Sequence, residues 1–128
     1  MILPNIETFI GCESGFEEAS IVLYGAPFDS TTSFRPGARF GPAAMRHESF
    51  GLETYSPYQD RDLMDIRVFD SGDLELCFGS SEMALSDIEK RAEEILNAGK
   101  FPLLLGGEHL VTLAAVRAAA AKYQNLHI

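Results

Sequence analysis

The sequence predicts an α/β fold in which helices cover both faces of a parallel sheet. Short apolar runs with the composition of buried strands alternate with longer helical segments. The predicted strands are residues 21–24, 66–69, 101–105 and 126–128. The predicted helices are residues 41–51, 83–98 and 110–122. Because alternating strands and helices form parallel sheets through right-handed crossovers, this order of elements predicts a parallel α/β sheet.

Signals at the segment ends support these elements. Gly41-Pro42 opens the first helix, because proline at the first helical position sacrifices no hydrogen bond. Gly99 is a typical C-terminal stop for the second helix. The apolar residues of that helix recur at helical spacing, at Leu85, Ile88, Ala92 and Ile95. Residues 52–65 form a polar excursion between the first helix and the second strand.

Length and composition limit the classes of function. A chain of 128 residues with 46% hydrophobic residues makes one compact domain with a real core. Its 19 acidic and 10 basic residues give a net charge of −9, which argues against a nucleic-acid partner and an anionic membrane surface. Acidity of this size first indicates solubility, and it is also compatible with a cationic ligand.

The chain carries no recognisable targeting signal. No apolar stretch has the length of a membrane span, and residues 1–10 lack the pattern of a secretory signal. Cys12 and Cys77 are therefore expected to be free thiols in the reducing cytoplasm. Because the sequence stops inside an expected central strand, we expect residues 1–128 to be the N-terminal part of a larger single domain. The alternative is a small self-sufficient sheet.

The sharpest candidate site follows the third strand, at Gly106-Gly107-Glu108-His109. In parallel sheets, ligands bind at the carboxyl ends of the strands, so the loops there should share one rim. Two glycines allow the backbone a tight turn and leave the imidazole of His109 free to bind a transition metal. Two alternatives are a capping or surface histidine and an anion-binding turn, although the lysine of a P-loop is missing.

Two other segments belong to the same expected rim. Residues 28–40 form a long loop with Arg35 and Arg39, which either serve a site or bond to backbone carbonyls. Residues 70–73 read Asp-Ser-Gly-Asp, which indicates a capped turn or the outer shell of a metal site. We interpret His47 as a surface residue and His127 as structural.

Taken together, the motifs resemble the ureohydrolase (arginase/agmatinase) family, and its agmatinase branch in particular. The resemblance covers the chain from about residue 20 to its end and matches the N-terminal portion of the family. The four matching segments stand in register and in the family's order: Gly-Ala-Pro-Phe-Asp at 25–29, Arg-Pro-Gly-Ala-Arg-Phe-Gly-Pro at 35–42, Asp-Ser-Gly-Asp at 70–73 and Gly-Gly-Glu-His at 106–109.

The resemblance implies an arginase-like three-layer fold and a binuclear manganese (Mn²⁺) site. It further implies that a water bridging the two ions attacks the guanidinium carbon of a small cationic guanidino substrate, such as agmatine, and that urea is released. His109 matches the first metal-binding histidine of the family, whose remaining ligands and catalytic residues would lie after Ile128. The 128-residue chain alone is therefore expected to be inactive. Members of the family are commonly homo-oligomers, which we expect here by analogy.

Leu110 departs from the family pattern, which has a serine after the histidine. Loss of that hydroxyl changes the surroundings of the metal, where secondary hydrogen bonds orient ligands. It leaves open a second reading, in which the chain is a non-catalytic α/β remnant or binding module that keeps the fold without the metal. A third reading is an unrelated α/β domain that binds phosphate at Gly106-Gly107.

Overall fold

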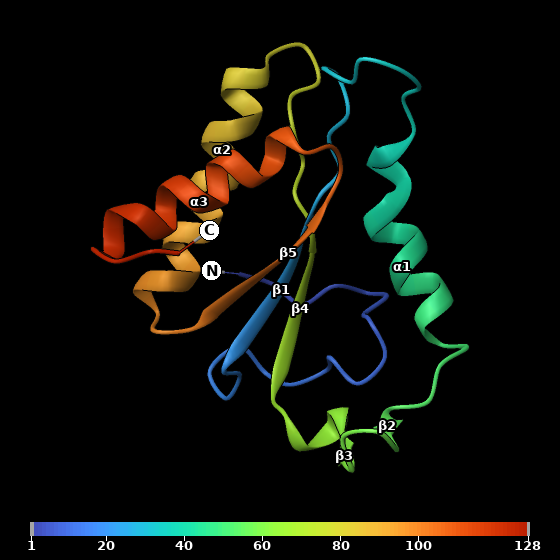
Figure 1. The fold of residues 1–128 in the computed structure, drawn as a ribbon. Helices are drawn as coiled ribbons and strands as arrows, with labels where there is room; N and C mark the ends of the chain where they lie inside the picture. Colours follow the sequence, from blue (N-terminus) through green and yellow to red (C-terminus); the bar gives the residue numbers. More distant parts are fainter. Residues whose placement is uncertain (1, 128) are drawn as a thin grey trace.

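The protein has a three-stranded parallel sheet with helices on both faces, as predicted (Figure 1). A computed structural model describes residues 2–127. Helix α1 lies on one face of the sheet, and α2 and α3 lie together on the other. In space, the strands follow the order β4-β1-β5. The strands are β1 (Ile21–Ala26), β4 (Val68–Asp73) and β5 (Phe101–Gly106), and the helices are α1 (Gly41–Ser49), α2 (Ser81–Asn97) and α3 (Leu110–Lys122).

The strand register brings the carboxyl ends of all three strands to one edge, as the sequence predicted. Ile21 at the start of β1 pairs with Val68 of β4 and with Phe101 of β5. The β1–β5 pairing continues without interruption to Ala26 and Gly106, whereas the β1–β4 register shifts between Leu23 and Gly25. The loops that follow β1 and β5 are therefore neighbours.

The main core lies between the sheet and the pair α2 and α3. Side chains of β1 alternate across the sheet, because successive strand residues point to opposite faces. Val22 and Tyr24 face the main core, where they join Ile88 and Ile95 of α2. Leu23 faces the other side and belongs to a smaller cluster with Cys12 and Val68. Most of the apolar burial therefore holds α2 and α3, and little of it holds α1.

Local signals fix the ends of the helices. The Ser80 side chain caps α2 by accepting a hydrogen bond from the Met83 amide, and Gly99 follows the helix with a φ of 73°. Pro42 stands in the first turn of α1, as predicted. The polar excursion contains a hairpin of β2 (Tyr55–Ser56) and β3 (Arg61–Asp62), followed by a short 3-10 turn.

Two strand predictions need correction. The second strand runs over Val68–Asp73 rather than residues 66–69, so Asp-Ser-Gly-Asp lies in the strand and is not a turn. The predicted strand at residues 126–128 is absent at Leu126 and His127, and Ile128 lies outside the described residues. Apolar composition alone does not make a strand, because its backbone groups also need a hydrogen-bonding neighbour.

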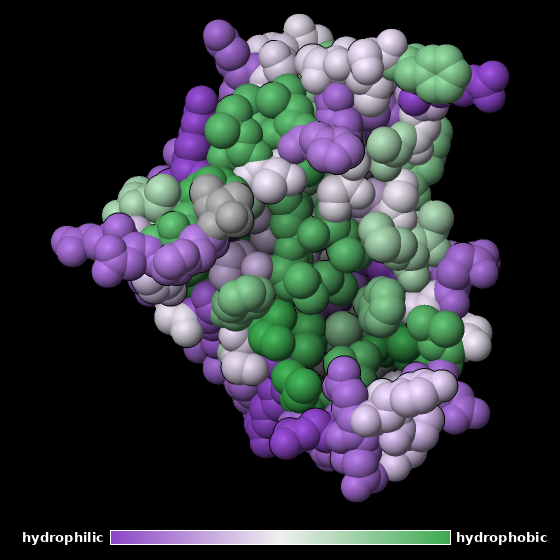
Figure 2. All heavy atoms as spheres, in the orientation of Figure 1, coloured by the Kyte–Doolittle hydropathy of each residue, from purple (hydrophilic) through white to green (hydrophobic). Residues whose placement is uncertain are grey.

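The N-terminal segment covers the β4 edge of the sheet, whereas no strand covers the β5 edge within the described residues. The N-terminal segment lies along β4, where the Asn5 and Ser14 amides donate hydrogen bonds to the Asp70 and Val68 carbonyls. Within residues 2–127, no strand pairs with the outer edge of β5. Figure 2 shows apolar side chains gathered over this strand. Phe101 and Leu103 of β5 are 63% and 44% exposed.

Both cysteines are free thiols, as predicted. Cys12 is buried, and burial raises the pKa of its thiol to about 11, which keeps it protonated and unreactive near neutral pH. Among the helices of the described residues, none has both the length and the apolar composition that a membrane crossing requires.

The open edge predicts that the 128-residue chain associates with itself when it is produced alone. Unpaired strand backbone flanked by apolar side chains is a template for strand pairing, and lysine on an edge opposes it. The double change Phe101→Lys and Leu103→Lys should shift the chain toward monomer in sedimentation velocity. As a control, Leu52→Lys replaces a leucine that is 60% exposed in a loop, and it should leave the association unchanged.

Candidate active site

A tight backbone contact builds the turn that carries His109. The Gly107 amide donates to the Ala26 carbonyl over 3.1 Å, and the Glu108 amide donates to the Phe28 carbonyl over 2.8 Å. A Cβ atom on Gly107 would lie 2.1 Å from the Phe28 oxygen, far inside van der Waals contact. Glycine is therefore required at position 107, because the chain after β1 crosses directly over it.

The same hydrogen bonds contradict the phosphate-binding reading of Gly106-Gly107. An anion at a glycine-rich turn needs free backbone N–H groups. The amides of Gly107 and Glu108 are both used inside the protein, and the Glu108 carboxylate would repel an anion there. These two backbone amides are therefore not available to bind an anion, and the turn instead exposes the side chain that follows it.

That side chain is His109, at the N-cap position of α3. It is exposed and lines an open cavity of about 360 Å³ together with Glu108 and residues 31–35. Across residues 2–127, no hydrogen bond or ion pair engages its imidazole. His109 therefore lies at the rim where the sequence placed it, with both ring nitrogens available to a metal or a ligand.

The residues present fit a metal ion only in part. A neutral imidazole is a good ligand for first-row transition metals, and His109 offers one. In the described part of the chain, no three His, Cys, Asp or Glu side chains come close enough to hold an ion. One nitrogen donor cannot hold a metal firmly, so a metal site at His109 would need ligands from elsewhere.

Leu110, the residue that departs from the family pattern, points away from this cavity. Its partly buried side chain packs against the main core beneath α3. The leucine therefore removes a hydroxyl from the turn but does not fill the space around His109.

The long loop at residues 28–40, hereafter the rim loop, is organised by the buried carboxylate of Asp29. Its Oδ2 accepts hydrogen bonds from the Gly37 and Arg39 amides at 2.6 and 3.1 Å, and its Oδ1 accepts one from Arg39 Nε at 2.6 Å. The Arg39 side chain holds the pKa of Asp29 at about 2, below its ordinary value of 3.8. Asp29 thus closes the rim loop by joining its two ends.

The two arginines of the rim loop differ in role. Arg39 pairs with the Asp29 carboxylate, and its guanidinium lies 4.5 Å from the centre of the Phe78 ring. The expected alternative, arginines bound to backbone carbonyls, is therefore wrong for Arg39. Arg35 is exposed, stands over the Phe34 ring and lines the His109 cavity. Arg39 is structural, and Arg35 faces the site.

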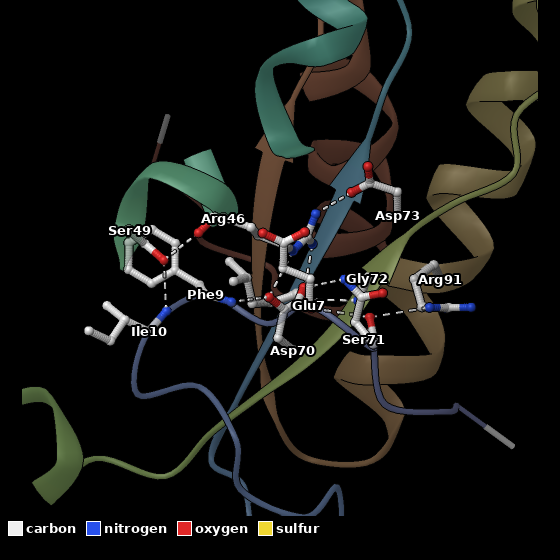
Figure 3. A network of polar contacts seen from close by, with 12 residues as sticks. Glu7, Phe9, Ile10, Arg46, Ser49, Asp70, Ser71, Gly72, Asp73 and Arg91 are labelled. Atoms are coloured by element: carbon white, nitrogen blue, oxygen red, sulfur yellow. Dashed lines mark hydrogen bonds and ion pairs between the residues drawn. The ribbon is translucent and has the colours of Figure 1, made fainter. Parts of the chain in front are cut away.

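A buried ion-pair network holds α1 to the sheet (Figure 3). Arg46 reaches from α1 to β4, where its Nε and Nη2 donate to the two oxygens of Asp70 at 2.8 and 2.9 Å. Its Nη1 donates to Asp73 Oδ1 at 2.5 Å. The backbone amides of Phe9 and Gly72 donate the two remaining hydrogen bonds to the Asp70 carboxylate. Every hydrogen-bonding position of the Asp70 carboxylate is thus used inside the protein.

This network corrects the interpretation of Asp70 and Asp73 as turn or outer-shell residues. Asp70 is fully buried within β4 and does not line the cavity of His109. Burial by itself lowers the pKa of Arg46, but hydrogen bonds to Asp70 and Asp73 outweigh it and raise the pKa above its ordinary value. A Cβ atom on Gly25 would lie 1.9 Å from Asp73 Oδ1. The position of the Asp73 carboxylate therefore leaves no room for a side chain at residue 25.

The other two histidines lie away from the rim. His47 is exposed on α1, where its Nδ1 lies 3.2 Å from Glu7 Oε1, as expected for a surface residue. His127 is exposed in the C-terminal segment and is not part of a strand. The contacts of Thr31, Asp29 and Arg46 could not be predicted from the sequence, because each contact joins residues that are far apart or that lie in an irregular loop.

A parallel sheet with a free histidine at the end of a strand defines an α/β domain with a site on its rim. The sequence profile described as the Arginase family matches residues 19–128. The chain belongs to the arginase family.

The relatives agree with this assignment. An agmatinase from Bacillus anthracis is 51% identical over 122 residues, which are 95% of this chain and 42% of that protein. A crystal structure of a candidate agmatinase from Clostridium difficile superposes with a TM-score of 0.83 at 48% identity, covering 86% of this chain and 40% of that one. The chain thus spans about two fifths of the length of these relatives.

A more distant structure carries metal. The formiminoglutamase of Trypanosoma cruzi, determined with two Mn²⁺ ions, has a TM-score of 0.77 at 26% identity. The match covers 91% of this chain and 42% of that one. The arginase-like fold of this chain is therefore shared with agmatinases and with a manganese-containing relative.

The contact at Gly107 predicts a large effect for a single methyl group. Gly107→Ala should lower the free energy of unfolding by about 3 kcal/mol or more, because the Phe28 backbone must move to admit the new Cβ. Urea titration followed by circular dichroism measures this. The matched control is Gly79→Ala, whose Cβ meets nothing within 4 Å and should change the free energy by less than about 1 kcal/mol.

The pKa of Asp29 predicts a pH-dependent contribution to stability. Its folded pKa of about 2 lies below the unfolded value of 3.8, so the stabilisation is present above pH 3.8 and disappears as the pH falls through about 2. Asp29→Asn should destabilise the protein at pH 6, and the difference in free energy of unfolding from wild type should shrink in acid. Asp65→Asn, at an exposed position, should show no such trend.

Proposed function

We propose that this chain forms the N-terminal part of a ureohydrolase that cleaves a small cationic guanidino compound related to agmatine into an amine and urea. The observation that carries the proposal is the 51% identity to an agmatinase over 95% of the chain. The free imidazole of His109 at the rim agrees with it. The net charge of −9 suits a cationic substrate.

In the proposed site, His109 is one ligand of a pair of Mn²⁺ ions. When bound, such a pair would supply a hydroxide nucleophile near neutral pH for the hydrolysis of a guanidinium group. The manganese in the formiminoglutamase relative supports this metal. The remaining ligands and the catalytic residues would come from the part of the protein that corresponds to the other three fifths of the relatives.

The residues of this chain position His109 and shape one wall of the site. Gly107 lets the turn pass beneath the rim loop, and the start of α3 directs the imidazole to the cavity. Because the described residues bring one histidine, His109, to the cavity, we expect the 128-residue polypeptide to be inactive by itself. A homo-oligomeric complete protein is part of the proposal by family analogy.

A non-catalytic domain is the competing function. Leu110 was the sequence feature in its favour, since it replaces the serine of the family pattern. The leucine packs on the core and leaves the cavity open, so the structure gives that alternative no specific support.

The decisive experiment uses the complete protein that contains this sequence. The wild type should bind Mn²⁺ and release urea from agmatine or another guanidino compound. His109→Ala should weaken Mn²⁺ binding by more than about 100-fold and abolish urea release, because a direct ligand matters at least as much as its supporting residues. Isothermal titration and a urea assay measure the two effects.

His47→Ala is the matched control, because His47 is exposed on α1 and lies away from the cavity. It should change neither metal binding nor urea release. Equal losses in the two variants would show that the site is misplaced. A complete protein that binds no Mn²⁺ and cleaves no guanidino compound would favour the non-catalytic domain.

A further inference from the structure

The inference concerns Glu108, the residue between Gly107 and His109. Its Oε1 accepts two hydrogen bonds from one residue of the rim loop, from the Thr31 amide at 3.0 Å and from Thr31 Oγ1 at 2.8 Å. Thr31 lies 77 residues away in the sequence. A single carboxylate oxygen therefore ties the turn after β5 to the tip of the rim loop.

Other contacts leave this part of the rim loop without support. The Asp29 carboxylate fixes the loop at Gly37 and Arg39, and Thr32 Oγ1 donates to the Asp29 carbonyl. Residues 30, 31 and 33–35 are exposed, so they have little apolar packing to hold them. In the described chain, Glu108 is the partner that joins this exposed stretch to another element.

The stretch that Glu108 holds forms a wall of the cavity that contains His109. Residues 31–35 line that cavity together with Glu108 and His109. The wall presents hydroxyl groups, the Phe34 ring and the Arg35 guanidinium. A loop that is displaced by even an ångström would change the contacts a substrate makes with this wall.

We infer that Glu108 is a positioning residue: it holds the rim loop in place as the wall that contacts the non-reacting part of the substrate. It acts through Thr31 as a hydrogen-bond acceptor and not as a metal ligand or a base. The inference rests on the proposed function for its catalytic readout. Its structural readout, the order of the rim loop, is independent of that function.

The kinetic test compares two substitutions in the complete protein. Glu108→Ala removes the acceptor and should raise the KM for agmatine by about tenfold with kcat within about twofold, because binding shared by ground and transition states is lost. Glu108→Gln keeps a carbonyl oxygen that can accept both bonds, so its KM should stay within about twofold of wild type. Glu93→Ala, an exposed glutamate on α2, is the control and should change neither constant.

A second substitution tests the other side of the contact. Thr31→Val removes the hydroxyl and keeps the main-chain amide, so KM should rise by about threefold, between wild type and Glu108→Ala. This variant changes an exposed residue, and so it remains informative if Glu108→Ala fails to fold. The Mn²⁺ affinity should be unchanged within about twofold in Glu108→Gln and Thr31→Val.

Hydrogen–deuterium exchange of residues 29–37 in the complete protein gives the independent readout. Exchange should be faster in Glu108→Ala than in wild type and unchanged in Glu108→Gln. The inference is overturned if Glu108→Gln loses kcat or Mn²⁺ affinity as Glu108→Ala does, or if Glu108→Ala leaves both exchange and KM unchanged. If the wild type cleaves no guanidino compound, the proposed function fails, and the exchange experiment still decides whether Glu108 holds the rim loop.

Discussion

The ion pair between Arg46 and Asp70 is the interaction on which the arrangement of the site depends. Helix α1 buries Pro42, Arg46 and Ser49, so its contact with the sheet is largely polar. Two buried charges stabilise a fold only when their hydrogen-bonding positions are satisfied, and removal of one partner typically costs about 3–5 kcal/mol. Asp70 meets this condition with four donors from three parts of the chain.

A fixed α1 determines where the rim loop ends, because the loop runs directly into that helix. The Asp29 carboxylate then joins the two ends of the loop, and Glu108 holds its exposed stretch. The carboxylates of Asp70, Asp29 and Glu108 thus supply the stabilising contacts that apolar packing supplies in the main core. These contacts explain how thirteen residues without a long regular element are held beside His109.

The sequence predicted what local patterns determine. Apolar runs located β1, β5 and the start of β4 but also predicted a strand that Leu126 and His127 do not form. Pro42, Gly99 and the spacing of Ile88 and Ile95 located the helices. Asp-Ser-Gly-Asp was misjudged because its local pattern is that of a turn, while its conformation is decided by β1 and Arg46. The partnership of Glu108 with Thr31 was equally hidden, because it depends on how two loops meet after the sheet has formed.

The open edge of β5 and the exposed imidazole of His109, three residues beyond the end of that strand, are connected in the chain, and this has a consequence for the proposed metal site. Strand β5 leads through Gly107 to His109, while its outer edge has no strand neighbour in residues 2–127. Any strand that pairs with this edge in parallel places its carboxyl end beside His109. The same step that covers Phe101 and Leu103 therefore brings new side chains to the cavity. A strand on this edge would therefore both cover the apolar side chains of β5 and place residues where the proposed metal site needs its further ligands.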